Sequence, residues 1–286
     1  MRPSTLLADA ARRLADAGVD SPRVDAELLL AHAIGVERAR LLVLDDVTDQ
    51  AAARFGALLA QRADRVPLQH LTGRAPFRFL ELTVGPGVFV PRPETEQLAG
   101  WALERLSGAG EPVVVDLGAG SGALALSIAH EHPGSRVTAV ERDAGAIEWT
   151  RHNAAARSAA GDTPVEVIAG DMTDAALLRE LDGTVDLVVS NPPYVPDGAR
   201  VPREVADHDP PLALWGGPDG LDVVRGLLVT AARLLRPGGW LGIEHADQQG
   251  STLPAVVRAH GGFTDVADHA DLAGRPRYTT ARRTGG

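Results

Sequence analysis

"PVVVDLGAGSGALAL", residues Pro112–Leu126, decides the fold class because it joins an apolar strand to an apolar helix through a glycine-rich turn. Glycines in such a turn let the backbone approach a ligand closely where a helix begins. Gly118, Gly120 and Ala123 also match the G-x-G-x-x-G/A fingerprint of dinucleotide-binding folds. We therefore predict a strand–turn–helix unit with a cofactor at the turn. The residues predicted to touch it are Gly118, Ala119, Gly120, Ser121 and Gly122.

Strand and helix patterns alternate from residue 111 onward. The predicted strands are "PVVVDLG", "RVTAVER", "VEVIAGD", "VDLVVSN" and "GWLGIEH", with helical stretches such as "GALALSIAHEH" between them. Short apolar strands interleaved with helices indicate a parallel sheet covered on both faces. The fold class is therefore α/β, a Rossmann-like, doubly wound, mostly parallel sheet, for which we expect the common strand order 3-2-1-4-5.

Acidic residues follow two of these strands. Glu141 ends the second strand, about 20 residues after the glycine turn, where an acid commonly binds ribose hydroxyls. Asp171 and Met172 follow the third strand, and we expect them to flank an adenine, although an Asp there is often a helix cap. These features fit any adenosine cofactor, whether a nicotinamide dinucleotide or S-adenosylmethionine.

"SNPPYV", residues Ser190–Val195, ends the fourth strand with a rigid kink. Proline fixes its own φ and has no N–H, so the ladder cannot continue and no competing donor is present. In the expected strand order this loop faces the glycine turn across one crevice. The Asn191 side-chain oxygen and the Pro192 carbonyl can each accept a hydrogen of a substrate NH2 group, while Pro193 stiffens the loop. Tyr194 can cover a flat substrate group and face a sulfonium cation.

The chain before the sheet has two predicted parts. Residues 1–73 read as a helical bundle, with caps at Ser21 and Thr48, and its predicted use is substrate docking. Residues 74–92 read as a β-hairpin linker in which "GPG", residues 85–87, turns the chain and "VFV" resumes a strand. Residues 93–286 form the predicted catalytic domain.

Composition excludes several classes of function. The chain has no Cys and no Lys, so thiolate nucleophiles, Cys-ligated metals, Schiff bases and the P-loop lysine are absent, and no metal site is predicted. No apolar run approaches the roughly 20 residues of a membrane span. Residues 1–92 carry 12 Arg and 11 acidic side chains, whereas the remainder carries 16 Arg and 27. This balance lacks the basic footprint of a DNA-binding protein.

Several blocks resemble the HemK/PrmC family of release factor glutamine N5-methyltransferases. "PLQHLTGRAPFRFLELTVGPGVFVPRPETE", "DLGAGSGALAL", "SNPPYV", "LWGGPDGLD" and "DLAGRPR" look like that family's blocks in its order, and "DSPRVDAELLLAHAIG" is similar to its N-terminal domain. The resemblance covers nearly the whole chain. One departure is Ala246, where the family commonly has Gly, and it leaves the roles of Glu244 and Gln248 open.

The resemblance implies a reaction, a cofactor and a partner. A methyl group would pass from S-adenosylmethionine to the side-chain amide of the glutamine in the Gly-Gly-Gln loop of peptide chain release factors. Catalysis would fall to Asn191, Pro192 and Tyr194, with Pro193 completing the substrate site and Asn191 also touching the cofactor. The resemblance also implies that the protein is a cytoplasmic enzyme that binds neither nucleic acid nor a membrane directly.

Other functions remain open at the level of sequence. A dehydrogenase would use the same glycine turn but has no need of the NPPY loop, and an adaptor would bind its partner without turnover. A glutamine methyltransferase acting on a ribosomal protein, or an adenine-N6 nucleic-acid methyltransferase, would use the same loop, since the loop also suits the amino group of adenine.

Overall fold

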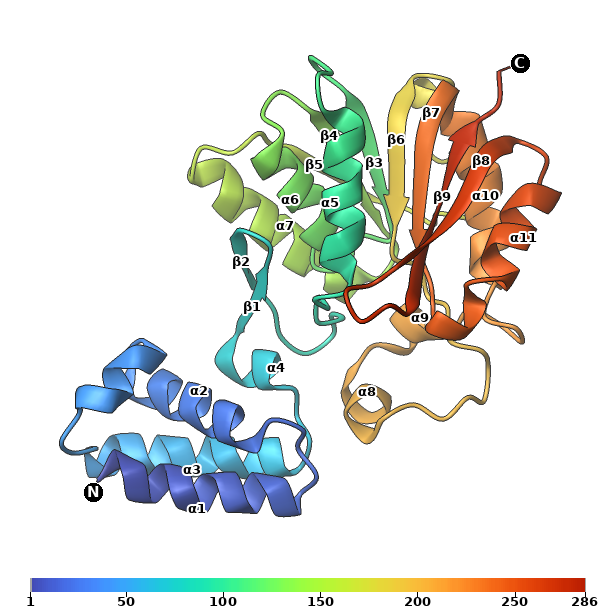
Figure 1. Cartoon of the computed structure of the whole chain (residues 1–286). Helices are drawn as coiled ribbons and strands as arrows, with labels where there is room; N and C mark the ends of the chain where they lie inside the picture. Colours follow the sequence, from blue (N-terminus) through green and yellow to red (C-terminus); the bar gives the residue numbers. More distant parts are fainter. Residues whose placement is uncertain (1, 286) are drawn as a thin grey trace. The chain divides into compact units, whose positions relative to one another are not determined.

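The computed structural model describes residues 2–285, which form two compact units (Figure 1). One unit contains residues 2–74, 84–86 and 201–208, and the other contains residues 75–83, 87–200 and 209–285. No helix among these residues is long and apolar enough to cross a membrane.

The first unit is a helical bundle. Its helices are α1 (Pro3–Asp16), α2 (Pro22–Ile34), η1 (Arg38–Val43), α3 (Asp49–Ala63), α4 (Leu68–Thr72) and α8 (Arg203–His208). Leu14, Leu29 and Phe55 are among the fully buried side chains of its core. The predicted cap at Thr48 is confirmed, because its hydroxyl accepts from Ala51 N at 3.3 Å, whereas Ser21 makes no side-chain cap bond.

The second unit is built on a seven-stranded sheet of order β5-β4-β3-β6-β7-β9-β8, which confirms the predicted order of its five parallel strands. The strands are β3 (Val113–Leu117), β4 (Arg136–Glu141), β5 (Val165–Ala169), β6 (Val185–Ser190), β7 (Leu235–Glu244), β8 (Phe263–Ala270) and β9 (Pro276–Arg283). Strands β8 and β9, which pair antiparallel at one edge of the sheet, were not predicted from the sequence. Their polar alternation, "FTDVADHA" and "PRYTTARR", lacks the apolar run that marked the inner strands.

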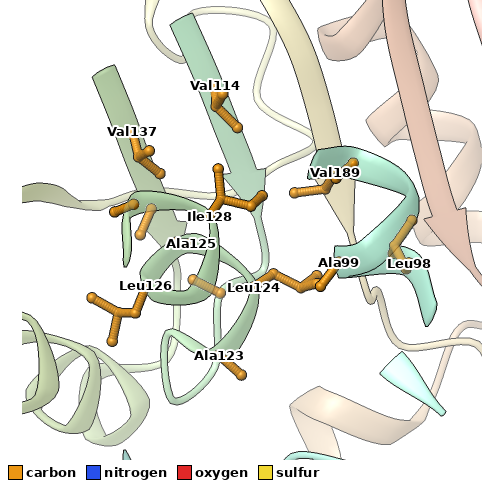
Figure 2. Close-up of a cluster of buried hydrophobic side chains, with 14 of the residues drawn as sticks. Leu98, Ala99, Val114, Ala123, Leu124, Ala125, Leu126, Ile128, Val137 and Val189 are labelled. Atoms are coloured by element: carbon orange, nitrogen blue, oxygen red, sulfur yellow. The ribbon is translucent and has the colours of Figure 1, made fainter. Parts of the chain in front are cut away.

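Helices cover both faces of this sheet. They are α5 (Thr95–Leu106), α6 (Ala123–Glu131), α7 (Ala144–Ala159), η2 (Arg179–Leu181), α9 (Pro211–Leu214), α10 (Asp222–Leu234), η3 (Asp247–Gln249) and α11 (Thr252–Ala259). Alternate side chains of a strand point to opposite faces, so Val114 packs with α5 and α6 while Val115 packs with α10. Figure 2 shows the hydrophobic cluster on the Val114 face of the sheet, where Leu98 of α5 and Ile128 of α6 pack against the strands.

The β-hairpin exists, but its turn is not where the sequence predicted it. Strands β1 (Arg74–Phe77) and β2 (Leu80–Thr83) pair across Arg78 and Phe79. The chain does turn at residues 86 and 87, as predicted, but this turn does not join the paired strands, and the predicted strand "VFV" is wrong because residues 88–90 form no strand. Arg78 adopts a φ of 50°, a left-handed conformation that costs a non-glycine residue about 1–2 kcal/mol. Its guanidinium is held by both carboxylate oxygens of Glu131, and its N–H donates to Glu96. These tertiary contacts offset a strain that no local sequence signal reveals.

A buried ion pair stabilises the helical unit. The Arg62 guanidinium lies 2.7 Å from the Asp25 carboxylate and 2.8 Å from that of Glu204, and it also donates to Val66 O. Arg62 and Asp25 are 6% and 7% exposed. The pair therefore fixes α3 against α2 and against the short helix α8.

We predict that Arg62→Ala lowers the free energy of unfolding by about 3–5 kcal/mol, because Asp25 is left buried without a counter-charge. The matched control is Arg12→Ala, which removes only an exposed pair with Asp9 and should cost less than about 0.5 kcal/mol. Urea denaturation of the two variants followed by circular dichroism measures the difference. Equal midpoints for them would contradict the stabilising role of the buried pair.

Candidate active site

The glycine turn after β3 makes room for a ligand beside the backbone. Gly118, Gly120 and Gly122 have φ values of 83°, 57° and 87°, in the region that L side chains rarely adopt. A Cβ added at Gly118 would lie 2.5 Å from Met172 Cε. The turn and the predicted adenine-flanking Met172, which is buried, are therefore neighbours in the structure.

Glu141, at the end of β4, faces the same turn. Its Oε2 accepts from Gly120 N at 2.9 Å, and its Oε1 accepts from the N–H groups of Arg142 and Asp143. Because two carboxylate oxygens offer about four acceptor positions, the side chain keeps capacity for a further donor. The structure thus places this carboxylate beside the glycine turn, as the sequence predicted.

Asp171 has local partners as well. Its Oδ1 accepts from the backbone and the hydroxyl of Thr173, and its Oδ2 lies 3.2 Å from the Arg142 guanidinium. Burial alone would raise the pKa of this carboxyl, but the hydrogen bonds from Thr173 and Arg142 hold it below its usual range. Asp171 is therefore a charged turn cap next to Met172, and its proposed contact with adenine requires sharing these oxygens.

Parallel pairing brings the NPPY loop to the glycine turn. Strands β3 and β6 are parallel neighbours with Asp116 opposite Val189, so the segments that follow the two strands leave the sheet at the same edge. The Ser190 hydroxyl donates to the Leu117 carbonyl, which ties the two strand ends together. Gly118 comes directly after Leu117, and Asn191 comes directly after Ser190. The glycine turn and the NPPY loop therefore begin side by side.

The segment "LWGGPDGLD", residues 214–222, hydrogen-bonds to the backbone at the end of the NPPY loop. Val195 N donates to Leu214 O at 2.8 Å, and Gly216 N donates to Val195 O at 2.9 Å. A Cβ on Gly216 would lie 2.7 Å from the Pro193 carbonyl oxygen, so only glycine fits there. The motif therefore has a mechanical role, which is to hold the kinked loop in place.

Gln249, rather than the exposed Gln248, joins three segments at this point. Its Nε2 donates to Tyr194 O at 3.1 Å and lies 3.4 Å from Asp219 O, while its Oε1 accepts from Ala246 N at 3.0 Å. The side chain is 6% exposed. Sequence reasoning missed Gln249, because either glutamine of the pair could have faced inward.

A second polar cluster lies under the NPPY loop. Asn191 Nδ2 donates to Thr95 Oγ1 at 3.3 Å, and both Thr95 and Tyr194 hydrogen-bond to the Glu244 carboxylate. Burial raises the pKa of Glu244 to about 7, although the Thr95 bond and the positive charge of Arg277 oppose the shift. Burial, together with Glu244, also raises the pKa of the Tyr194 phenol, which stays protonated and donates. Thr95 and Glu244 were not among the predicted site residues.

Asp116 is another buried acid that the predictions missed. It interrupts the apolar run "VVVDL", which was the available signal. Its Oδ2 accepts from Ala125 N at 3.1 Å, while Oδ1 has no hydrogen-bond partner among residues 2–285. Burial raises the pKa of Asp116 to about 7, and the nearby Glu141 charge adds to the shift. An acceptor left without a partner beneath the glycine turn suits a ligand that carries a donor.

The site as a whole fits an adenosine cofactor with a positive charge. Gly120 has open space beside its backbone, Glu141 offers acceptors for ribose hydroxyls, and Asp116 provides an unpaired buried acceptor. Within residues 2–285 no group of three or more His, Asp and Glu side chains could hold a metal ion. Fold and site together define the class of S-adenosylmethionine-dependent methyltransferases.

Comparison with known proteins gives the particular family. The family model described as the PrmC N-terminal domain matches residues 5–73, and the model of the methyltransferase small domain matches residues 81–207. The release factor glutamine methyltransferase of Mycolicibacterium smegmatis is 52% identical over 99% of this chain and 98% of that protein. The enzyme of the same name from Streptomyces coelicolor is also 52% identical, over 97% of this chain and 96% of its own length.

The chain therefore belongs to the release factor glutamine methyltransferase family. It is a methyltransferase, and S-adenosylmethionine is its methyl donor. The solved T. thermophilus 16S rRNA N2 methyltransferase, in complex with AdoMet and guanosine, is 24% identical with a TM-score of 0.52. That likeness covers 73% of this chain and 49% of the other, and it shows the shared fold.

We predict that Gln249→Ala lowers the free energy of unfolding by about 1–3 kcal/mol, because Tyr194 O and Ala246 N lose their buried partner. The neighbouring Gln248→Ala removes an exposed side chain and should change stability by less than about 0.5 kcal/mol. Urea denaturation of both variants measures the difference. If the two variants unfold alike, Gln249 does not anchor the loop.

We predict that Glu141→Ala weakens binding of S-adenosylmethionine about tenfold or more, since charge-assisted hydrogen bonds contribute roughly 1.5–3 kcal/mol. Glu166→Ala, which removes an exposed carboxylate from the neighbouring strand β5, should leave the affinity unchanged. Isothermal titration calorimetry gives both dissociation constants. An unchanged constant for Glu141→Ala would exclude it as the ribose ligand.

Proposed function

We propose that this chain transfers a methyl group from S-adenosylmethionine to the side-chain amide nitrogen (N5) of the glutamine in the Gly-Gly-Gln motif of peptide chain release factors. The observation that carries the proposal is the junction of the NPPY loop with the glycine turn. Ser190 and Leu117 join the two strand ends, so acceptors for an NH2 group stand beside the cofactor residues. The names of the two 52% identical relatives support the choice of substrate.

Two acceptors of the NPPY loop orient the substrate amide. An amide nitrogen is a poor nucleophile because its lone pair is delocalised into its carbonyl group. In the proposed mechanism the Asn191 side-chain oxygen and the Pro192 carbonyl oxygen each accept one hydrogen, which aims the lone pair at the methyl group. Orientation of this kind contributes up to about 7–11 kcal/mol in favourable cases. Tyr194 covers the planar amide, Pro193 keeps the loop rigid, and water takes the proton after transfer.

The cofactor residues have matching roles. When bound, S-adenosylmethionine would supply an electrophilic methyl group on a positively charged sulfur, whose bond to that methyl breaks to leave the neutral thioether S-adenosylhomocysteine. Residues 118–122 cradle it, Glu141 accepts from its ribose, and Asp171 with Met172 flanks its adenine. Asn191 touches it from the opposite side. Asp116, whose Oδ1 lacks a partner in the described part of the chain, joins this set as a candidate acceptor for its ammonium group.

The N-terminal helices are assigned to docking of the protein substrate. Residues 1–73 carry none of the proposed catalytic groups, and a separate family model matches residues 5–73. Residues 74–92 act as the hairpin linker and residues 93–286 as the methyltransferase domain. Release factors act in translation, so the place of work is the cytoplasm. The acidic balance of residues 93–286 argues against direct binding of nucleic acid.

We predict that Asn191→Ala lowers the rate of methyl transfer about 10²–10³-fold, by analogy with removal of one oriented hydrogen-bonding group from an active site. The measurement is single-turnover transfer of labelled methyl to purified release factor at saturating cofactor, which separates chemistry from binding. Gln248→Ala serves as the control with parent-like rates. A rate for Asn191→Ala within about threefold of the parent would overturn the orienting role.

The same assay decides between acceptors. Four acceptors are offered separately with labelled S-adenosylmethionine: intact release factor, release factor whose Gly-Gly-Gln glutamine is replaced, total ribosomal protein, and adenine-containing DNA. Label that appears only on intact release factor supports the proposal. Label on ribosomal protein or DNA instead would assign the chain another substrate.

A further inference from the structure

The buried pair of Thr95 and Glu244 has no part in the proposed chemistry, yet it touches the residue that receives the substrate. We propose that Thr95, held in place by Glu244, is a positioning residue that fixes which way the Asn191 side-chain amide faces. The inference rests on the proposed function, because there the Asn191 oxygen receives an N–H of the reacting amide.

Thr95 is rigidly placed. It begins helix α5, is 4% exposed, and its N–H donates to Arg92 O at 3.1 Å. Its hydroxyl lies 3.3 Å from Asn191 Nδ2 and hydrogen-bonds to Glu244 at the end of β7. Glu244 is itself 1% exposed and is also bonded by the Tyr194 hydroxyl. The Thr95 hydroxyl therefore lies between the buried Glu244 carboxyl and the Asn191 amide.

The direction of these bonds follows from the number of hydrogens. A threonine hydroxyl has one hydrogen to donate and lone pairs to accept with. A Thr95 hydroxyl that donates its hydrogen to the Glu244 carboxylate can only accept from Asn191, and the structure has Asn191 Nδ2 donating to Thr95 Oγ1. Asn191 must then turn its NH2 group toward Thr95, and its oxygen faces away from Thr95, available to the substrate.

Without this control the amide could turn over. The two ends of an asparagine amide have nearly the same shape, so packing alone selects weakly between them. An inverted Asn191 would present N–H to the N–H of the substrate, and two donors cannot bond to each other. Thr95 thus selects the productive orientation, and the carboxylate form of Glu244 reinforces that selection by accepting the Thr95 hydrogen.

The chain offers a direct probe, because its only two asparagines are Asn153 and Asn191. Protein labelled with ¹⁵N-asparagine gives two side-chain NH2 signals in an NMR spectrum. Asn153 is a built-in reference, since its Nδ2 donates to Thr83 O and Ser121 O. Thr95→Val keeps the shape of the side chain and removes the acceptor. Asn191 NH2 hydrogens should then exchange with water at least tenfold faster, while those of Asn153 remain unchanged.

Catalysis gives the second readout. At saturating S-adenosylmethionine, single-turnover methyl transfer by Thr95→Val should fall about tenfold or more, with cofactor affinity within twofold of the parent. Thr95→Ser keeps the hydroxyl and should restore both the rate and the slow exchange. Thr230→Val is the matched control, because the Thr230 hydroxyl is buried in α10 without a hydrogen-bond partner among the described residues. It should behave as the parent in both assays.

Two results would overturn the inference. One is unchanged exchange of the Asn191 signal in Thr95→Val, and the other is a loss in Thr95→Ser as large as in Thr95→Val. Failure of the proposed function can be told apart from these two results, because in that case the parent enzyme itself leaves release factor unlabelled. The NMR measurement needs no substrate and decides the role of Thr95 in either case.

Discussion

The parallel pairing of β3 with β6 is the constraint on which the site depends. Parallel strands leave a sheet at the same edge, so two loops separated by about 70 residues of chain emerge side by side. The bond from the Ser190 hydroxyl to Leu117 O holds the two exits together. A one-residue change of register would turn Ser190 to the other face and separate the NPPY loop from the glycine turn.

Two buried carboxyl groups at the active-site edge of the sheet, Asp116 and Glu244, lower the stability of the fold locally. Asp116 and Glu244 are carboxyl groups in places where apolar side chains would pack without a desolvation cost. Burial raises the pKa of each to about 7, and each keeps an oxygen without a hydrogen-bond partner among residues 2–285. Both lie at strand ends facing the site rather than in the middle of the core. Buried acceptors of this kind provide directional contacts that a hydrocarbon core cannot.

The NPPY loop, which follows β6, is held rigid by hydrogen bonds from other parts of the chain. Two consecutive prolines remove backbone donors, so the NPPY loop cannot be held by its own N–H groups at those positions. The structure supplies outside support through the Gly216 backbone and the Gln249 side chain. Gly216 cannot be replaced without collision with the Pro193 carbonyl. The NPPY loop is therefore stiff because two other segments, residues 214–216 and Gln249, hydrogen-bond to it.

The amino-acid sequence alone was enough to predict the α/β class, the glycine turn and the NPPY loop, because each rests on local signals such as apolar runs, glycines and prolines. The strand order followed from the order that is common among doubly wound sheets. It failed at the hairpin turn, where Arg78 adopts a left-handed conformation that only its contacts with Glu131 and Glu96 explain. It also missed Thr95, Asp116, Glu244 and Gln249 as parts of the site. Local patterns fix which way a backbone runs, whereas the orientation of a buried polar side chain depends on partners that folding alone brings within reach.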